Sequence, residues 1–416
     1  MSGPLTGIRV LDLTTVIMGP YACQLLGDYG ADVIKVEAPD GDVMRLSGPM
    51  RHPGMGHLYL STNRNKRSIS IDLKSSSGRS VLLKLAETAD IIVYNIRPNA
   101  MTRLGLSYDD LREVNPKIIY VGAFGFSQRG PYAARPAYDD LIQGMSGIPW
   151  LSLQAGASEP RYAPTILADR VVGLQVALAA TAALQHRNRT REGQRVDVPM
   201  YEGLLSIVLG EHLAGRAFEP PLGDVGYQRS LAHNRRPHRT LDGYICTLVY
   251  NDKHWRSFFE VIGQPAMFEA DARFSSQGAR LKHIDEVYGY LAGVLATRTT
   301  DEWLNSLTAA DIPAARMNSL GDILADEHLA AIGYLRTSRH PTEGEIVEIS
   351  VPTEWSSAHP EISRHAPSLG EHSIEILHEA GIDEEHVNRL LKQGVVRQSR
   401  TTTGDGDNQC DTRLSQ

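Results

Sequence analysis

The chain has 416 residues, of which 42% are hydrophobic and 22% charged, and its 42 Lys and Arg against 49 Asp and Glu give a formal net charge of −7. This length can bury a large core in more than one domain, and the composition excludes wholesale disorder. A mildly acidic chain has no electrostatic reason to bind nucleic acid. Cys23, Cys246 and Cys410 are too far apart for a metal motif or a disulfide framework.

The N-terminal segment indicates a location inside the cell. Residues 1–7 lack the charged and apolar regions of a signal peptide. The longest apolar stretch, residues 171–184, contains Gln175 and is too short to span a bilayer. We therefore expect a soluble, cytoplasmic protein with neither a membrane nor a nucleic-acid partner.

The first part of the chain alternates strand and helix patterns. Strands are expected at residues 9–14, 32–37, 68–73, 90–95 and 118–123, and helices at residues 20–30, 78–88 and 108–115. Strands separated by helices indicate βαβ units and a parallel sheet with helices on its faces. Ligands of such sheets bind beyond the carboxyl ends of the strands, so we look for chemistry in the loops after Thr14, Glu37, Asn95 and Phe124.

The second part of the chain is less regular. Helices are expected at residues 136–146, 167–187, 255–262, 284–295 and 373–380 and from Tyr201 onward, with strands at residues 195–198 and 243–250 and from Gly344. The predicted fold class is α/β, with a Rossmann-like parallel sheet in a large domain and a second, smaller α+β domain.

The first strand-to-helix turn argues against a dinucleotide cofactor. Residues 14–20 contain one glycine, Gly19, where a nucleotide-binding turn has three. Basic residues near the strand ends, at residues 63–67 and at Lys74, Arg97 and Arg103, could hold an anionic ligand, although each alone is more often a solvated surface residue.

The candidate catalytic groups are carboxylates. Asp139 and Asp140 begin one expected helix, and Asp169 begins the long one. Spacing alone makes Asp169 more often a helix cap than a catalyst. No metal-binding spacing and no G-x-S-x-G motif occur, so zinc and serine-hydrolase chemistry are disfavoured.

The sequence resembles the class III CoA-transferases, the group related to carnitine CoA-transferase, bile-acid-inducible CoA-transferase and formyl-CoA transferase. The matching segments follow one another in the family's order, and together they are highly specific. They are residues 5–14, 19–20, 27–37, 63–68, 95–98, 130–132, 138–139 with Gln143, 146–147, 168–169, 193–197 and 369–372.

The resemblance implies that Asp169 is the catalytic nucleophile, that acyl-CoA and a carboxylic acid are the substrates, and that no cofactor is tightly bound. It implies no metal. Ala137, Tyr138 and Asp139 would flank the thioester. The residues expected to hold CoA are Val16, Ile17 and Met18 along the pantetheine, and Ile71, Asp72, Leu73, Lys74, Asn95, Ile96, Arg97 and Arg103 at the nucleotide end.

Three departures separate the chain from formyl-CoA transferase. Ala38 stands where that enzyme has an arginine on CoA, a contact that Arg45 or Lys66 could replace. Ile17 stands where it has a glutamine, and its glycine-rich gating loop is missing. The departures argue against formyl-CoA/oxalate specificity and not against the family.

The resemblance also implies an interlocked homodimer of ring-like chains. The expected division is a large CoA-binding domain at 1–200, a linker at 201–230, a small α+β domain at 231–325, a linker and return to the large domain at 326–395, and a disordered tail at 396–416.

Two other functions remain open. An α-methylacyl-CoA racemase would need a base before Asp139, where this chain has Tyr138, a poor base at neutral pH. A non-catalytic CoA-binding protein would have no need to retain Asp169.

Overall fold

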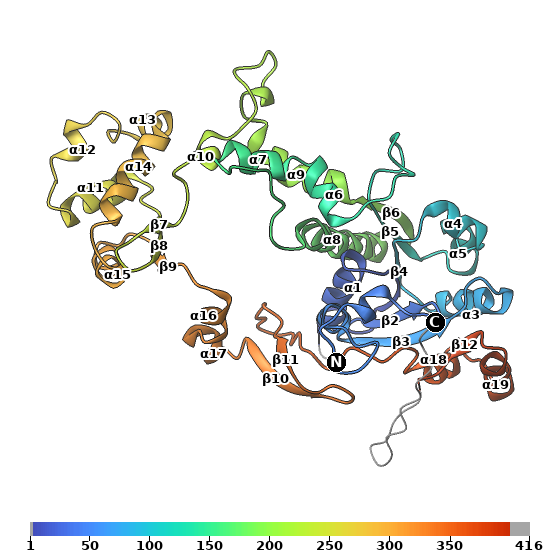
Figure 1. Ribbon diagram of the computed structural model, residues 1–416. Helices are drawn as coiled ribbons and strands as arrows, with labels where there is room; N and C mark the ends of the chain where they lie inside the picture. The colour runs from blue at the N-terminus through green and yellow to red at the C-terminus, as the bar shows by residue number, and fades with distance from the viewer. Residues whose placement is uncertain (1–2, 400–416) are drawn as a thin grey trace, which may run out of the picture. The chain divides into compact units, whose positions relative to one another are not determined.

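The structure is a computed structural model that describes residues 3–399, and its largest element is a seven-stranded sheet (Figure 1). The strands lie in the order β12-β3-β2-β1-β4-β5-β6; all neighbours are parallel except β12, which pairs antiparallel with β3. The expected parallel sheet is thus confirmed. The bounds are β1 (Arg9–Leu13), β2 (Asp32–Glu37), β3 (Lys66–Ile71), β4 (Ile91–Tyr94), β5 (Ile119–Phe124), β6 (Gln194–Pro199) and β12 (Val396–Arg397).

Helices cover both faces of this sheet. In Figure 1, α3, α18 and α19 lie on one side of the strands, and α1 and α8 on the other. Leu11 and Ile34 of the sheet are buried in one cluster with Leu82 of α3, Ile376 of α18 and Leu390 of α19. The bounds are α1 (Met18–Asp28), η1 (Val43–Leu46), α2 (His57–Asn63), α3 (Ser76–Ala86), α4 (Pro98–Arg103), α5 (Tyr108–Val114), α8 (Leu167–Thr190), α18 (Ser373–Glu379) and α19 (Glu384–Lys392).

The chain divides into two compact units. Among the described residues, the first consists of residues 3–137, Asp169–Met200 and residues 334–399, and the second of Tyr138–Ala168 and Tyr201–Gly333. This division differs from the expected one, because residues 138–168 group with the second unit and α9 (Met200–His212) occupies much of the expected linker. The hairpin of β10 (Leu335–His340) and β11 (Gly344–Ile349) belongs to the first unit.

The second unit has an aromatic core. Trp255, Phe258, Phe259, Phe274 and Trp303 are buried together beside a three-stranded antiparallel sheet. Its remaining elements are α6 (Asp139–Met145), α7 (Ile148–Gln154), η2 (Ala214–Ala217), α10 (Gln228–Leu231), β7 (His238–Arg239), β8 (Tyr244–Thr247), α11 (Asp252–Val261), α12 (Met267–Ala270), α13 (Gln277–Lys282), α14 (Ile284–Leu295), α15 (Thr300–Ala309), β9 (Ala314–Arg316), α16 (Leu320–Leu324) and α17 (Glu327–Ala331).

The structure changes two expectations: where the C-terminal tail begins, and whether α8 has the length of a membrane-spanning helix. The tail does not begin at residue 396, because Val396 is buried and pairs with Ile71; residues 400–416, with Cys410, lie outside the described residues. Within residues 3–399, α8 alone is long and apolar enough to cross a membrane by length and composition. Its face with Val172, Val176 and Ala180 is buried, as in the core helix of a folded domain.

Candidate active site

The loops after β1 and β4 lie side by side where the strand order of the sheet reverses. Such a reversal is the usual ligand position in open parallel sheets. The Thr15 N–H donates to Asn95 Oδ1 over 3.1 Å, and Asn95 Nδ2 donates to the Thr15 carbonyl over 2.8 Å. Asn95 therefore joins the loop expected to follow the pantetheine to the loop expected to hold the nucleotide.

The turn at Val16 has a strained backbone. Its φ of 74° is a left-handed conformation that a β-branched residue adopts only at a steric cost. The Val16 N–H donates to Asp42 Oδ1 over 3.2 Å, and Lys35 Nζ donates to Asp42 Oδ2 and to the Thr14 carbonyl, each over 3.0 Å. These bonds hold the turn in place against that cost.

The three residues expected to line the pantetheine differ in exposure. Val16 is half-buried, whereas the side chains of Ile17 and Met18 are buried. Gly19 follows at a close approach, because a Cβ there would lie 2.4 Å from the Thr14 Cβ. Of the three side chains, that of Val16 is therefore the most accessible.

A network of buried charges underlies this turn. Lys66 Nζ lies 2.8 Å from Asp12 Oδ2, and neither side chain is exposed. Burial by itself would raise the pKa of Asp12, but Lys66 and Lys35 outweigh it and lower that pKa to about 2. Asp12 Oδ1 accepts from the Thr14 N–H over 2.9 Å, so the network reaches the turn directly.

Neither residue expected to replace the arginine missing at Ala38 is available for CoA. Lys66 is held by Asp12, as described above. Arg45 donates from Nε and Nη2 to the two carboxylate oxygens of Glu37 over 2.8 and 2.7 Å, and its guanidinium lies over the Tyr59 ring. Both cations are buried structural residues, and the proposed replacement is wrong for this conformation of the chain.

The expected basic rim at residues 63–67 is also structural. Arg64 pairs with Asp28 over 2.8 Å. Arg67 pairs with Asp32 over 2.8 Å and contacts two carboxylates of α18. These arginines tie α1, the sheet and the C-terminal helices together and do not form an anion site.

The other predicted basic residues remain accessible. Lys74, Arg97 and Arg103 are exposed; Lys74 follows β3, and the other two lie at opposite ends of the short helix α4 after β4. Asp72 Oδ1 accepts from the Lys74 N–H over 2.9 Å and shapes the first of these loops. Their apolar neighbours Ile71, Leu73 and Ile96 contribute to the hydrophobic core.

Two of the expected thioester neighbours belong to the second unit. Tyr138 is exposed and Asp139 begins α6. Gln143 Nε2 donates to Asp139 Oδ2 over 2.6 Å, and Gln143 Oε1 accepts from the Ala163 N–H over 2.9 Å. Ala137 is the last residue of the adjoining segment of the first unit. It packs closely on Gly125, because a Cβ added to Gly125 would lie 2.2 Å from the Ala137 Cβ.

Asp169 lies in the first turn of α8 and is buried, with 7% of its surface exposed. The position agrees with the sequence expectation of a carboxylate at the start of the long helix. A carboxylate shielded from bulk water at this position is suited to attack a substrate carbonyl if the substrate itself closes the site.

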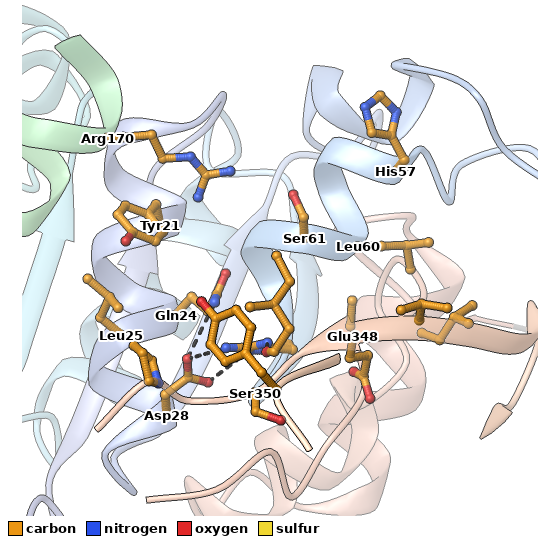
Figure 2. Close-up of a pocket in the computed structure, with 17 residues that line it drawn as sticks. Tyr21, Gln24, Leu25, Asp28, His57, Leu60, Ser61, Arg170, Glu348 and Ser350 are labelled. Atoms are coloured by element: carbon orange, nitrogen blue, oxygen red, sulfur yellow. Dashed lines mark hydrogen bonds and ion pairs between the residues drawn. The ribbon is translucent and has the colours of Figure 1, made fainter. Parts of the chain in front are cut away.

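A cavity of about 550 Å³ adjoins α1 in the first unit (Figure 2). Tyr21, Leu25 and Leu60 line it, together with residues of β11. Arg170, the residue after Asp169, reaches over α1 toward this cavity, with its guanidinium 4.4 Å from the centre of the Tyr21 ring.

The sequence analysis missed Arg170, Tyr21 and Asp42. The signal for the first was its place beside Asp169, and for the second the spacing of Tyr21, Leu25 and Asp28 on one face of α1. Asp42 also caps η1, accepting from the Met44 N–H over 3.0 Å, but its bonds to Lys35 and to the Val16 N–H join distant parts of the chain and leave no local signal.

Comparison with known proteins identifies the family. The family model for CoA-transferase family III matches residues 5–373. A succinate–glutarate CoA-transferase of Agrobacterium fabrum is 33% identical over 392 residues, 90% of this chain and 95% of that protein. A formyl-CoA:oxalate CoA-transferase of Streptomyces coelicolor is 33% identical and covers 94% of this chain and 99% of its own length.

Solved structures agree with these relatives. The crystal structure of Rv3272 from Mycobacterium tuberculosis superposes with a TM-score of 0.78 at 31% identity, covering 90% of this chain and 99% of that one. A CAIB/BAIF family protein from Brucella suis gives a TM-score of 0.76 at 29% identity, covering 91% and 100%. The chain therefore belongs to CoA-transferase family III and is a CoA-transferase.

Proposed function

We propose that the enzyme moves CoA from an acyl-CoA to a free carboxylic acid through covalent intermediates on Asp169. The observation that carries this proposal is the buried carboxylate of Asp169 in the first turn of α8, within a chain matched to the family over residues 5–373. The enzyme needs no tightly bound cofactor, because a carboxylate supplies the nucleophile and the thioester supplies the leaving group. We place this reaction in the cytoplasm.

The reaction begins when an Asp169 carboxylate oxygen attacks the thioester carbonyl. The C–S bond breaks, leaving an aspartyl–acyl anhydride and the CoA thiolate. The thiolate then attacks the aspartyl carbonyl and expels the donor acid, which forms an aspartyl-CoA thioester. The acceptor carboxylate attacks this thioester, and the same steps run in reverse to give the new acyl-CoA and free Asp169. Each intermediate exchanges one activated carboxylate for another, so little free energy is lost if water is excluded.

A substrate panel tests the proposed reaction. The enzyme is incubated with succinyl-CoA, acetyl-CoA or an aryl-CoA and a set of mono- and dicarboxylic acids, and new thioesters are read by mass. The relatives named above carry succinate, glutarate and oxalate in their names, so these acids belong in the set. New acyl-CoA that requires both donor and acceptor supports transfer. Hydrolysis alone, or exchange of the α-proton of an acyl-CoA without any acceptor, would contradict it.

Arg103→Ala is expected to raise KM for acyl-CoA about tenfold with kcat changed less than about twofold, because a nucleotide contact is present equally in ground and transition states. Arg112→Ala is the matched control, since Arg112 is also an exposed arginine in the last turn of a short helix, α5. Steady-state kinetics with varied acyl-CoA measures both constants. Equal KM values for the two variants would show that Arg103 is a surface residue.

We also propose that the active form is an interlocked homodimer. The first unit is assembled from three chain segments, between which the chain twice leaves and returns. Two such chains threaded through each other could not separate without unfolding, so assembly and stability would be inseparable. Sedimentation over a wide dilution range is expected to show a dimer at every concentration that retains activity. An active monomer at nanomolar concentration would overturn the interlocked architecture.

A further inference from the structure

Val16 differs from the other residues that have a left-handed backbone. Within residues 3–399, five residues other than glycine have a positive φ, and Val16 is the one β-branched residue among them. The two branches at its Cβ crowd the backbone in this conformation, so the conformation persists only where the surroundings enforce it. Backbone strain of this kind concentrates at functional sites, which raises the question of what the turn at Val16 does.

Hydrogen bonds from side chains enforce the shape of this turn. Five such bonds reach the backbone N–H and C=O groups of residues 14–16, and they come from Asp12, Lys35, Asn95 and Asp42, with two from Asn95. Asp42 is the member of this set that bonds to the strained residue itself, because its Oδ1 accepts from the Val16 N–H over 3.2 Å.

Asp42 is itself held firmly in place. Its side chain is fully buried, Oδ2 accepts from Lys35 Nζ over 3.0 Å, and Oδ1 also accepts from the Met44 N–H over 3.0 Å. The Asp42 N–H donates to Glu37 Oε1 over 3.0 Å. Since Lys35 Nζ also donates to the Thr14 carbonyl, one buried ion pair holds the turn at two points of its backbone.

The contacts of Asp42 require a carboxylate. Both of its oxygens face donors, Oδ1 the Val16 N–H and Oδ2 the ammonium of Lys35. An asparagine could accept from one of these donors and would turn its NH2 group toward the other. Burial alone would lower the pKa of Lys35, but Asp12, Asp42 and Glu37 outweigh it and raise that pKa, so Lys35 stays charged at neutral pH.

The place of the turn in the fold relates its shape to CoA binding. It lies where the strand order reverses, and Asn95 joins it to the loop after β4. The pantetheine is expected along residues 16–18, and the nucleotide beside Arg97 and Arg103. The backbone of Val16 would therefore decide where the pantetheine runs once the nucleotide is bound. A turn that is already shaped in the free enzyme avoids the cost of ordering it around the substrate.

We propose that Asp42 is a positioning residue that holds the strained turn at Val16 in the shape that binds the pantetheine arm of CoA. This inference rests on the proposed binding of CoA at this edge of the sheet. Because Asp42 is buried, it acts through the Val16 N–H and not by touching the substrate. Without its carboxylate, the turn relaxes to relieve the strain at Val16, and the pantetheine loses contacts.

The first test compares CoA with adenosine 3′,5′-bisphosphate, its nucleotide fragment, by calorimetry on the wild-type protein and Asp42→Asn. The substitution should raise the Kd for CoA about tenfold and that for the fragment by less than about twofold, because the fragment has no pantetheine. Asp90→Asn is the matched control, since Asp90 also joins a backbone N–H, that of Arg9, to a cation, Arg187, but at the amino edge of the sheet. It should bind both ligands as the wild type does.

A double-mutant cycle tests whether Asp42 acts through Val16. Glycine adopts a positive φ without strain, so a Val16→Gly turn needs less restraint. In that background, the effect of Asp42→Asn on the Kd for CoA should shrink from about tenfold to less than about threefold. Arg191→Gly makes a glycine at another residue of positive φ, 68°, which is exposed, and should leave the tenfold effect intact.

A second variant covers a failure of Asp42→Asn to fold. Lys35→Met/Asp42→Leu removes the buried cation together with the acid, so no buried charge is left unpaired at this position, and it should separate the two ligands in the same way. A rise in Kd as large for the nucleotide fragment as for CoA, or no rise for either, would overturn the role of Asp42. A tenfold effect that persists in the Val16→Gly background would also overturn it.

These binding measurements need no turnover, so they separate the role of Asp42 from the proposed reaction. If the wild type transfers CoA to an acid but Asp42→Asn binds CoA normally, the role of Asp42 fails alone. If Asp42→Asn weakens CoA and spares the fragment, but the wild type transfers CoA to no acid, the proposed reaction fails and the role of Asp42 stands.

Discussion

Replacing Asp169 with alanine is expected to lower CoA transfer by at least about a thousandfold, because removal of a nucleophile eliminates the covalent path. CoA binding should change little, since the exposed cations Lys74, Arg97 and Arg103 remain. Transfer is measured by mass detection of the new thioester and CoA binding by calorimetry. Hydroxylamine added with acyl-CoA should modify Asp169 in the wild-type protein. The variant should remain unmodified at position 169.

The control separates catalysis from helix capping. Asp110 also lies in the first turn of a helix, where it completes the capping box of α5 with Ser107. Asp110→Ala is expected to lose about 1 kcal/mol of unfolding free energy and to keep its activity. Substantial transfer by pure Asp169→Ala protein, or an equal loss of activity in both variants, would remove Asp169 from the mechanism.

The parallel sheet was predictable because the residues of its strands, and the residues next to them in the chain, carry the strand pattern. Residues 9–14 and 32–37 are apolar runs that end near a helix start or a glycine, and the observed strands Arg9–Leu13 and Asp32–Glu37 match them closely. The edge strand Val396–Arg397 was missed because two residues carry no periodic pattern. Only its pairing with β3 makes it a strand.

The charged residues show where sequence reasoning stops. Lys66 and Arg67 look like a basic rim in the sequence, yet Lys66 pairs with Asp12, 54 residues away, and Arg67 with Glu379, 312 residues away. Whether a lysine is solvated or buried depends on such distant partners, and no local spacing records them. Asp169 was found through the family motif, because spacing alone made it more often a helix cap than a catalyst.

Asp12→Ala is expected to destabilise the fold by about 3–5 kcal/mol, because it removes the carboxylate that compensates the buried ammonium groups of Lys66 and Lys35. Urea unfolding at neutral pH measures this loss. The double variant Asp12→Ala/Lys66→Met removes the cation along with the acid, and should recover part of the lost stability. Asp109→Ala, which removes an exposed carboxylate of α5, is the control and should change the unfolding free energy by less than about 0.5 kcal/mol.

The pH dependence of the difference in unfolding free energy between wild type and Asp12→Ala tests whether the charge of the Asp12 carboxylate causes that difference. The folded-state pKa of Asp12, about 2, lies below its ordinary value of 3.8, so its contribution to stability is fully present above about pH 4 and is lost as the pH falls toward 2. The gap between wild type and Asp12→Ala should therefore be constant from neutral pH to about pH 5 and should narrow between pH 4 and pH 2. A gap that persists undiminished at pH 2 would mean that the packing of the Asp12 side chain, and not its ion pair with Lys66, stabilises the turn after β1.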